Sequence, residues 1–151
     1  MSIRGEKIPM LRTIFGLTLL ILIISCDQND CNEKGVVDAF VIGYDQCTGV
    51  FDPNGGNVGL ILRIPSTSDT VVTYNFPKGL YTFPPEYFSY YQFYCFFPDS
   101  TLSNFQIKLS YRIANNNEKE YPLCRADINL YYFNKYVKDR QIIIECVTKT
   151  D

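Results

Sequence analysis

Acidic side chains are the first candidates for catalysis in this chain, because its 151 residues include no histidine. The lack of histidine excludes Ser-His-Asp and Cys-His catalysis and removes the commonest zinc ligand. A glycosidase needs two carboxylates held roughly 5 to 9.5 Å apart. No spacing pairs the candidates, which are Glu86, Asp99, Glu118, Glu120, Asp127 and Glu145. The sequence therefore predicts no catalytic residues, no metal and no cofactor, and it favours a non-enzymatic role.

The first 25 residues have the composition of a secretory signal. Residues 1–12 carry Arg4, Lys7 and Arg12 against one acidic residue, and an apolar run follows over residues 14–24. A basic start, a short apolar middle and a small residue before the cleavage site are the parts of such a signal. The run is too short for a membrane-spanning helix, which needs about 20 apolar residues. We expect residues 1–25 to be removed as a signal peptide.

The segment Ile23-Ile24-Ser25-Cys26 resembles the lipobox of bacterial lipoproteins. In that family a peptidase cuts before the cysteine, and the cysteine thiol receives a diacylglycerol. The resemblance implies that Cys26 is lipidated and that acyl chains of the palmitate kind hold the protein at a membrane. Two or more acyl chains give stable anchoring, whereas one chain holds a protein only marginally. The alternative is an ordinary signal peptide that ends at an incidental cysteine.

Residues 26–34 are polar and acidic, which predicts a flexible tether. Asp27 and Asp30 follow the cysteine and resemble the surface-export signal of Bacteroidota lipoproteins. In proteobacterial lipoproteins, Asp in that place implies retention at the inner membrane instead. We expect a cell-envelope protein in the outer membrane, at its periplasmic face or at the cell surface, with residues 35–151 as one β-rich domain.

Five cysteines remain besides the lipidated one, and export to an oxidising compartment permits disulfides. Five is an odd number, so at least one thiol is free or pairs outside the chain. Cys31 lies in the tether and Cys146 near the C-terminal end, so we expect any pairing to occur among Cys47, Cys95 and Cys124. Unpaired buried cysteines are the alternative, since a free cysteine packs as a small apolar residue.

Two kinds of short motif could mark a binding or modification site. Asp52, Asn54 and Asn57 have the spacing of an oxygen-rich calcium loop, but a bidentate Glu is missing, so a turn is the favoured interpretation. Asp69-Thr70-Val71 and Asp99-Ser100-Thr101 resemble the three-residue O-glycosylation pattern of Bacteroidota. The motif of Asp52, Asn54 and Asn57 therefore predicts no metal site.

An aromatic run occupies residues 87–97. Tyrosines are preferred contact residues, because one end of the side chain is apolar and the other is polar. We expect an envelope protein or a glycan as the partner, and the candidate binding residues are Tyr87, Tyr90, Tyr91 and Tyr94. The alternative is that the run forms core and a covering loop. Tyr131, Tyr132 and Tyr136 raise the same question.

The formal net charge of −2 does not suit nucleic acid, which needs a basic face.

β-branched and aromatic segments predict strands over residues 35–44, 58–64, 70–76, 91–97, 105–114 and 141–148. The segment 105–114 alternates most clearly, and its expected inward face consists of Phe105, Ile107, Leu109, Tyr111 and Ile113. One helical turn is expected over residues 86–90, after two prolines. Residues 128–138 fit either a helix or a kinked strand.

Five to seven strands with long loops and little helix predict a mainly β fold. The favoured architecture is a small antiparallel barrel of the OB-like Greek-key type, and a β-sandwich is the runner-up. Residues 43–49, 94–98 and 140–144 resemble segments of small uncharacterised Bacteroidota lipoproteins, which implies a location but no activity.

Two roles follow for such a protein. We expect a lipid-anchored envelope protein with a binding or structural role, and the alternative is a small carboxylate-based hydrolase or an enzyme inhibitor. An enzyme needs convergent carboxylates in a concave site, whereas a binding module presents exposed tyrosines on one face.

Overall fold

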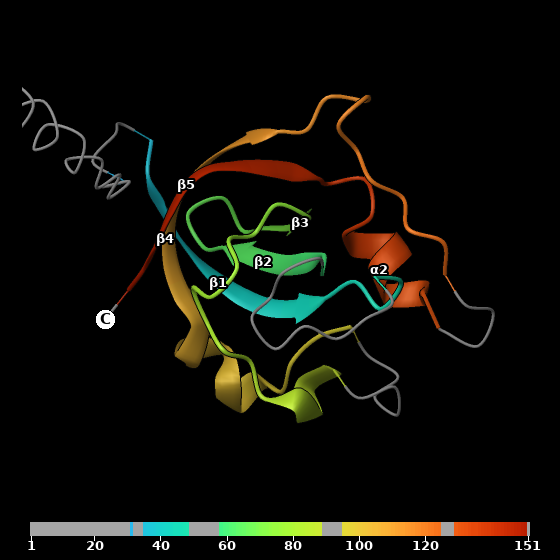
Figure 1. Ribbon diagram of the computed structural model, residues 1–151, viewed down its shortest axis with the longest axis horizontal. Helices are drawn as coiled ribbons and strands as arrows, with labels where there is room; N and C mark the ends of the chain where they lie inside the picture. Colours follow the sequence, from blue (N-terminus) through green and yellow to red (C-terminus); the bar gives the residue numbers. More distant parts are fainter. Residues whose placement is uncertain (1–30, 32–34, 49–57, 89–94, 125–128, 151) are drawn as a thin grey trace, which may run out of the picture.

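The structure is a computed structural model, and it describes Cys31 and residues 35–48, 58–88, 95–124 and 129–150. Within these residues, one antiparallel sheet has the strand order β3-β2-β1-β4-β5 (Figure 1). Its strands are β1 (Val37–Tyr44), β2 (Leu60–Ile64), β3 (Asp69–Thr73), β4 (Gln106–Ile113) and β5 (Ile142–Lys149). The prediction of a mainly β fold is confirmed.

Each of these strands overlaps a segment whose β-branched and aromatic residues predicted one, and only β3 at Asp69 and β5 at Lys149 extend beyond the predicted bounds, by one residue each. The remaining predicted strand, over residues 91–97, is described only from Cys95 onward. There the chain runs beside the end of β1, where the Phe97 N–H donates to the Ile42 carbonyl at 2.7 Å and the Tyr44 N–H donates to the Cys95 carbonyl at 2.9 Å. A side chain at Gly43 would clash with the Cys95 carbonyl oxygen, so this close approach needs glycine.

Helical structure in the described chain is short. The 3-10 helices η2 (Pro85–Phe88) and η3 (Asp99–Phe105) lie between β3 and β4, and η2 begins at a proline as expected. The α-helix α2 (Tyr131–Tyr136) lies between β4 and β5. For the segment 128–138 the structure therefore selects the helix over the kinked strand.

The two outer edges of the sheet come together at two places, at Val72 of β3 and at Asn75 just after it, where the Asn75 side chain donates to the Ile144 carbonyl at 2.9 Å and accepts from the Ile144 N–H at 3.0 Å. Val72 forms an isolated parallel bridge with Gln141, and the Val72 N–H donates to the Arg140 carbonyl at 3.0 Å. The sheet curls to bring these edges together (Figure 1). In the described chain these contacts do not extend into a ladder, so the sheet is not closed into a barrel.

The inside of the curled sheet holds the larger apolar cluster. Alternate strand residues such as Leu62 and Leu109 are fully buried there. Aromatic rings from the segment between β3 and β4 fill the rest, with the Phe83 and Phe105 centroids 4.9 Å apart. Such large apolar side chains dominate the energetics of a core.

A second cluster covers the outer face of β1, β2 and β3. Phe133 of α2 and the adjacent Val137 pack over Ile42, Ile61 and Val72 on this face. The part of these strands beneath α2 is therefore buried on both faces and is apolar there, whereas Asp38 and Arg63 further along the outer face are exposed. Burial on the second face depends on α2, an element far away in the sequence.

The alternation in β4 holds for part of its length. Phe105, Ile107 and Leu109 are buried as expected, but Ile113 is 65% exposed, so the prediction of an inward Ile113 was wrong. A register shift between Ser110 and Tyr111 interrupts the pairing with β5, and such an irregularity bends the pair. Beyond this shift the inward face of β4 is no longer covered in full.

The structure contains two disulfides, Cys31–Cys146 and Cys47–Cys124. Their Cα–Cα separations of 5.8 Å and 4.4 Å lie within the usual range for disulfides. Cys95 is free and buried. The expectation that pairing would be restricted to Cys47, Cys95 and Cys124 thus has to be corrected. Cys31, which we placed in the tether, is joined to β5 because the fold brings the start of the described chain beside that strand.

Candidate functional site

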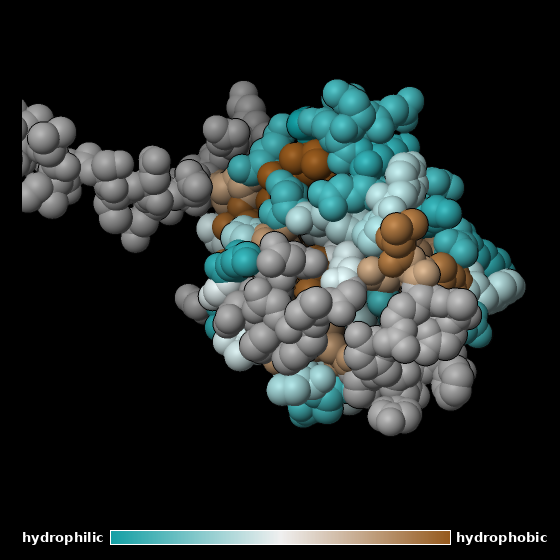
Figure 2. Space-filling model, turned by 45° about the vertical axis from the view of Figure 1, so that its right-hand side comes forward, coloured by the Kyte–Doolittle hydropathy of each residue, from teal (hydrophilic) through white to brown (hydrophobic). Residues whose placement is uncertain are grey.

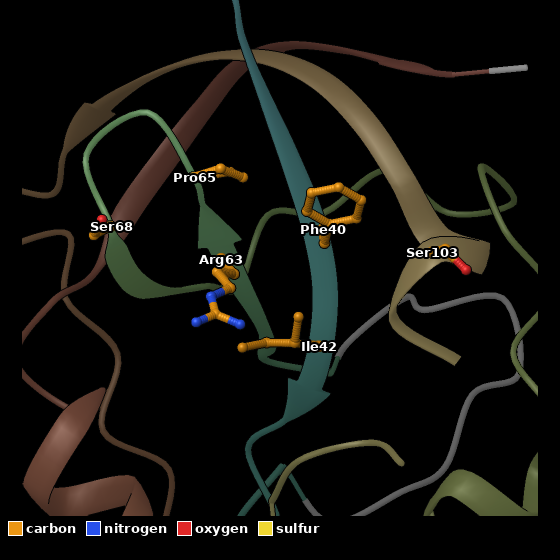
Figure 3. A pocket seen from close by; sticks show the side chains of 6 residues that line it. All are labelled: Phe40, Ile42, Arg63, Pro65, Ser68 and Ser103. Carbon is orange, nitrogen blue, oxygen red and sulfur yellow. The ribbon is translucent and has the colours of Figure 1, made fainter. Parts of the chain in front are cut away.

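A groove of about 420 Å³ lies on the outer face of β1 and β2 (Figure 3). The residues that line it are Phe40, Ile42, Arg63, Pro65, Ser68 and Ser103. Phe40 and Ile42 make its floor apolar, and Arg63 adds one positive charge. None of the sequence patterns pointed to this groove.

Strand pairing positions the two central side chains of the groove. Phe40 of β1 lies directly opposite Arg63 of β2, so both project from the same face of the sheet. Pro65 and Ser68 belong to the tight turn between β2 and β3, where Ser68 has a φ of 60°. Ser103 comes from η3 and closes the groove from the other side.

Arg63 is exposed and forms no ion pair or side-chain hydrogen bond with any residue that the structure describes. Its guanidinium offers five donors in a planar fork that fits a carboxylate or a phosphate. The apolar floor beside it can take an alkyl or aromatic group. The groove therefore suits a ligand that joins an anionic group to an apolar part.

A smaller pocket of about 80 Å³ contains the buried carboxylate of Asp45 and is lined also by Tyr74, Glu120 and Lys138. Burial raises the pKa of Asp45, although hydrogen bonds from Cys47 and Tyr74 act in the opposite direction. Burial also raises the pKa of Tyr74, and the neighbouring charge of Asp45 adds to this effect. Among the described residues, this pocket is the candidate place for a carboxylate-based hydrolase, because Asp45 and Glu120 both line it.

The hydrogen bonds of Asp45 indicate a structural role. One carboxylate oxygen accepts from the Tyr74 hydroxyl at 2.7 Å, and the other accepts from the Cys47 N–H at 2.9 Å. The second bond makes an Asx turn, in which a side chain holds the backbone two residues further on. Both carboxylate oxygens thus accept hydrogen bonds that stabilise the turn in which the disulfide-bonded Cys47 lies.

The other carboxylates are placed apart from this pocket. Glu118 accepts two hydrogen bonds from Arg112, and Glu145 lies 3.8 Å from the same guanidinium. The Arg112 guanidinium lowers the pKa of Glu118 to about 2. Glu86 and Asp99 begin or flank the 3-10 helices. Among the residues that the structure covers, no group of three or more Cys, Asp or Glu side chains could hold a metal ion.

Of the tyrosines proposed for binding in the aromatic run, Tyr87 is the one that the structure describes. It is half-buried and packs on the inner core, with its ring centroid 5.1 Å from that of Phe97. Several residues of interest lie outside the described part: Tyr90, Tyr91, Tyr94, Cys26, Asp127 and the Asp52, Asn54 and Asn57 motif. For Tyr87, the alternative of core packing fits better than an exposed contact residue.

Exposed tyrosines occur instead on α2. Tyr131, Tyr132 and Tyr136 are exposed there, and Lys135 lies 4.9 Å from the centroid of the Tyr136 ring. Pro122 lines a pocket together with Phe133 of α2, and the next residue, Leu123, is 98% exposed. Figure 2 turns this end of the molecule toward the viewer and shows apolar side chains protruding from a largely hydrophilic surface. This end presents contact-type side chains, although cations already cover some of the ring faces.

The two glycosylation-like motifs have different settings. Thr70 lies within β3 and pairs with Arg63 of β2, while Asp69 lies 3.7 Å from Arg140. In the second motif, the Thr101 hydroxyl donates to the Pro98 carbonyl at 2.7 Å. Ser100 is exposed at the start of η3. Access for a glycan is therefore better at residues 99–101 than at residues 69–71.

No protein-family model matches this chain, and the comparisons with curated proteins and with solved structures found no match either. Across the described ranges, none of the helices has the length and apolar character that crossing a bilayer requires.

Proposed function

We propose that this chain is a lipid-anchored protein of the cell envelope whose β-domain binds a ligand. The anchor is the acylated Cys26, which belongs to the lipobox-like segment Ile23-Ile24-Ser25-Cys26. The location is the outer membrane, at its periplasmic face or at the cell surface. Two or more acyl chains on one cysteine would hold the protein stably there.

The observation that carries the binding role is the unpartnered Arg63 beside the apolar floor of the groove. An unpaired guanidinium next to a half-buried aromatic ring is well placed to attract a carboxylate or phosphate attached to an apolar group. An envelope protein or a glycan that carries such a group is the expected partner.

A hydrolase or an enzyme inhibitor receives less support. In the pocket that two carboxylates line, Asp45 is already committed to two hydrogen bonds within the protein. A general acid or base needs a free oxygen directed at the substrate. Binding therefore remains the favoured role.

For the architecture, we propose a partly open OB-like barrel rather than a sandwich. The strand order β3-β2-β1-β4-β5 and the parallel bridge between Val72 and Gln141 support this arrangement, because the bridge joins the two outer strands. Nuclear Overhauser contacts between the backbones of Val72 and Gln141 and between the Asn75 side chain and the Ile144 amide are expected. Their absence would leave an open sheet.

Binding is tested with 4-phenylbutyrate as a probe and with the neutral 4-phenylbutyramide as its uncharged match. Nuclear magnetic resonance titration should move the amide signals of Phe40 and Arg63 with the carboxylate and much less with the amide. Arg63→Gln should weaken binding at least about tenfold, which corresponds to roughly 1.4 kcal/mol. Lys108→Ala removes one positive charge at an exposed site of β4 and should leave the affinity for the probe nearly unchanged. Equal binding of both probes would reject the groove as an anion site.

The anchor is tested separately by mass spectrometry of the mature protein. An acylated cysteine at residue 26 is expected at the N-terminus. Cys26→Ser should release the protein from the membrane or leave the precursor unprocessed. A retained segment 1–25 on the native protein would reject the lipoprotein assignment.

A further inference from the structure

The disulfide Cys31–Cys146 fixes the start of the described chain to β5. Cys146 lies in the middle of that strand, directly opposite Ser110 of β4. Without this disulfide, the first residue held in the sheet would be Val37, where β1 begins. The disulfide therefore moves the first point of attachment six residues closer to the N-terminus.

This shorter connection limits how far the domain can move from Cys26. Cys31 lies five positions after Cys26, and an extended chain spans at most about 3.6 Å per residue, so the reach is roughly 18 Å. Val37 lies eleven positions after Cys26, for which the reach is roughly 40 Å. With the disulfide, the domain cannot turn freely above a membrane that holds Cys26.

The attachment point defines which end of the domain must lie near the membrane. The C-terminus, the beginning of β1 and the crossing of β4 and β5 lie together at one end, whereas α2 lies at the opposite end (Figure 1). Lys108 and Lys149 are exposed near the first end, but they project from opposite faces of the sheet, because Lys149 pairs with the buried Ile107 and Lys108 pairs with Thr148. Lys149 lies over the Tyr81 ring, and Lys108 lies opposite the exposed Asp38 of β1, so the two lysines report the position of this end and do not form a basic patch.

We propose that the Cys31–Cys146 disulfide orients the domain on the bilayer, with the end that holds the β4–β5 crossing toward the phospholipid headgroups. The end that carries α2 and the exposed tyrosines then points away from the bilayer. This orientation rests on the proposed lipidation of Cys26. The surface concerned is distinct from the groove, so it adds a second interaction to the proposed function.

Lysine footprinting of the full lipidated protein tests the orientation. The protein is placed in vesicles of phosphatidylethanolamine and phosphatidylglycerol and treated with an amine-reactive reagent, and each lysine is quantified by mass spectrometry. The reference is the unlipidated Cys26→Ser protein in solution. Modification of Lys108 and Lys149, relative to Lys135 and Lys138 beside the exposed tyrosines, should fall at least about threefold on vesicles.

The double variant Cys31→Ser/Cys146→Ser serves as the control, because it keeps the lipid and lengthens the connection. Its protection ratio should return most of the way to that of the reference protein. If the wild-type protein binds the vesicles but labels all four lysines as the reference does, the orientation is overturned while the anchor stands. If the protein carries no lipid and does not bind the vesicles, the proposed anchor fails, and the orientation fails with it.

Discussion

The two ends of the molecule each carry one disulfide, but the disulfides join different kinds of structure. Cys31–Cys146 attaches the N-terminal segment to β5, which already pairs with β4 along seven residue positions. Cys47–Cys124 joins a turn to an irregular segment that precedes α2. Regular strand pairing thus stabilises the first end, whereas the second end depends on a cross-link and on the hydrogen bonds of Asp45.

This difference fits the exposure of side chains at the two ends. An end made of turns and a six-residue helix can present tyrosines that a regular ladder would bury or pair. The end at which β4 and β5 pair is better suited to hold the N-terminal segment through the Cys31–Cys146 disulfide. The following changes should separate the two ends, in order of decreasing effect.

Truncation of the ladder core should have the largest effect. Leu109 in β4 is fully buried, so Leu109→Ala should lower the free energy of unfolding by about 2 to 5 kcal/mol through lost transfer energy and the remaining cavity. Lys108→Ala on the exposed face should cost about 0.5 kcal/mol or less. Urea unfolding of both variants measures the difference. Equal midpoints would mean that β4 does not have one buried and one exposed face.

Removal of either disulfide should cost about 2 to 4 kcal/mol, because a cross-link restricts the unfolded chain. The two variants should differ in local protection. Cys47→Ser/Cys124→Ser should speed hydrogen exchange at the Asp45 to Thr48 turn, since the turn loses its partner segment. Cys31→Ser/Cys146→Ser should leave the amides of β4 and β5 protected. Faster exchange in that ladder would show that both ends depend equally on their disulfides.

Loss of the Asp45 carboxylate should destabilise the turn end by about 1 to 3 kcal/mol, because Asp45→Ala leaves the hydroxyl of the half-buried Tyr74 and the Cys47 N–H without their partner. Asp38→Ala, at an exposed position of β1, should change stability by about 0.5 kcal/mol or less. Thermal unfolding followed by circular dichroism compares the two. A silent Asp45→Ala would mean that the disulfide alone holds the turn.

The smallest effect concerns the ion pair between Arg112 and Glu118. Hydrogen bonding to Arg112 lowers the pKa of Glu118 to about 2, so the pair stabilises the fold above the ordinary carboxyl pKa near 4.5. This contribution is lost as the pH falls through about 2, where the folded protein takes up the proton. Nuclear magnetic resonance titration of the Glu118 carboxyl should give the low value. In Arg112→Gln the pKa of Glu118 should rise toward the ordinary one, and an unchanged pKa would assign the shift to the Asn115 N–H instead.

Local pattern was sufficient to place the strands, because alternation and β-branching act over a few residues. Phe105, Ile107 and Leu109 were assigned to the core from spacing alone and are buried. The lack of histidine, visible in the sequence, also excluded the commonest catalytic arrangements. The lipobox-like segment is likewise a matter of sequence, and its role stays a prediction.

Tertiary structure decided the features that depend on distant partners. Cys31 meets Cys146 across 115 positions of sequence, a pairing that no spacing rule specifies. Ile113 is exposed because a register shift between β4 and β5 interrupts their pairing. Arg63 and Phe40 form a groove only because β1 and β2 pair in this register. Sequence patterns report the periodicity of each element, whereas partners, coverage of a second face and grooves arise from how the elements pack.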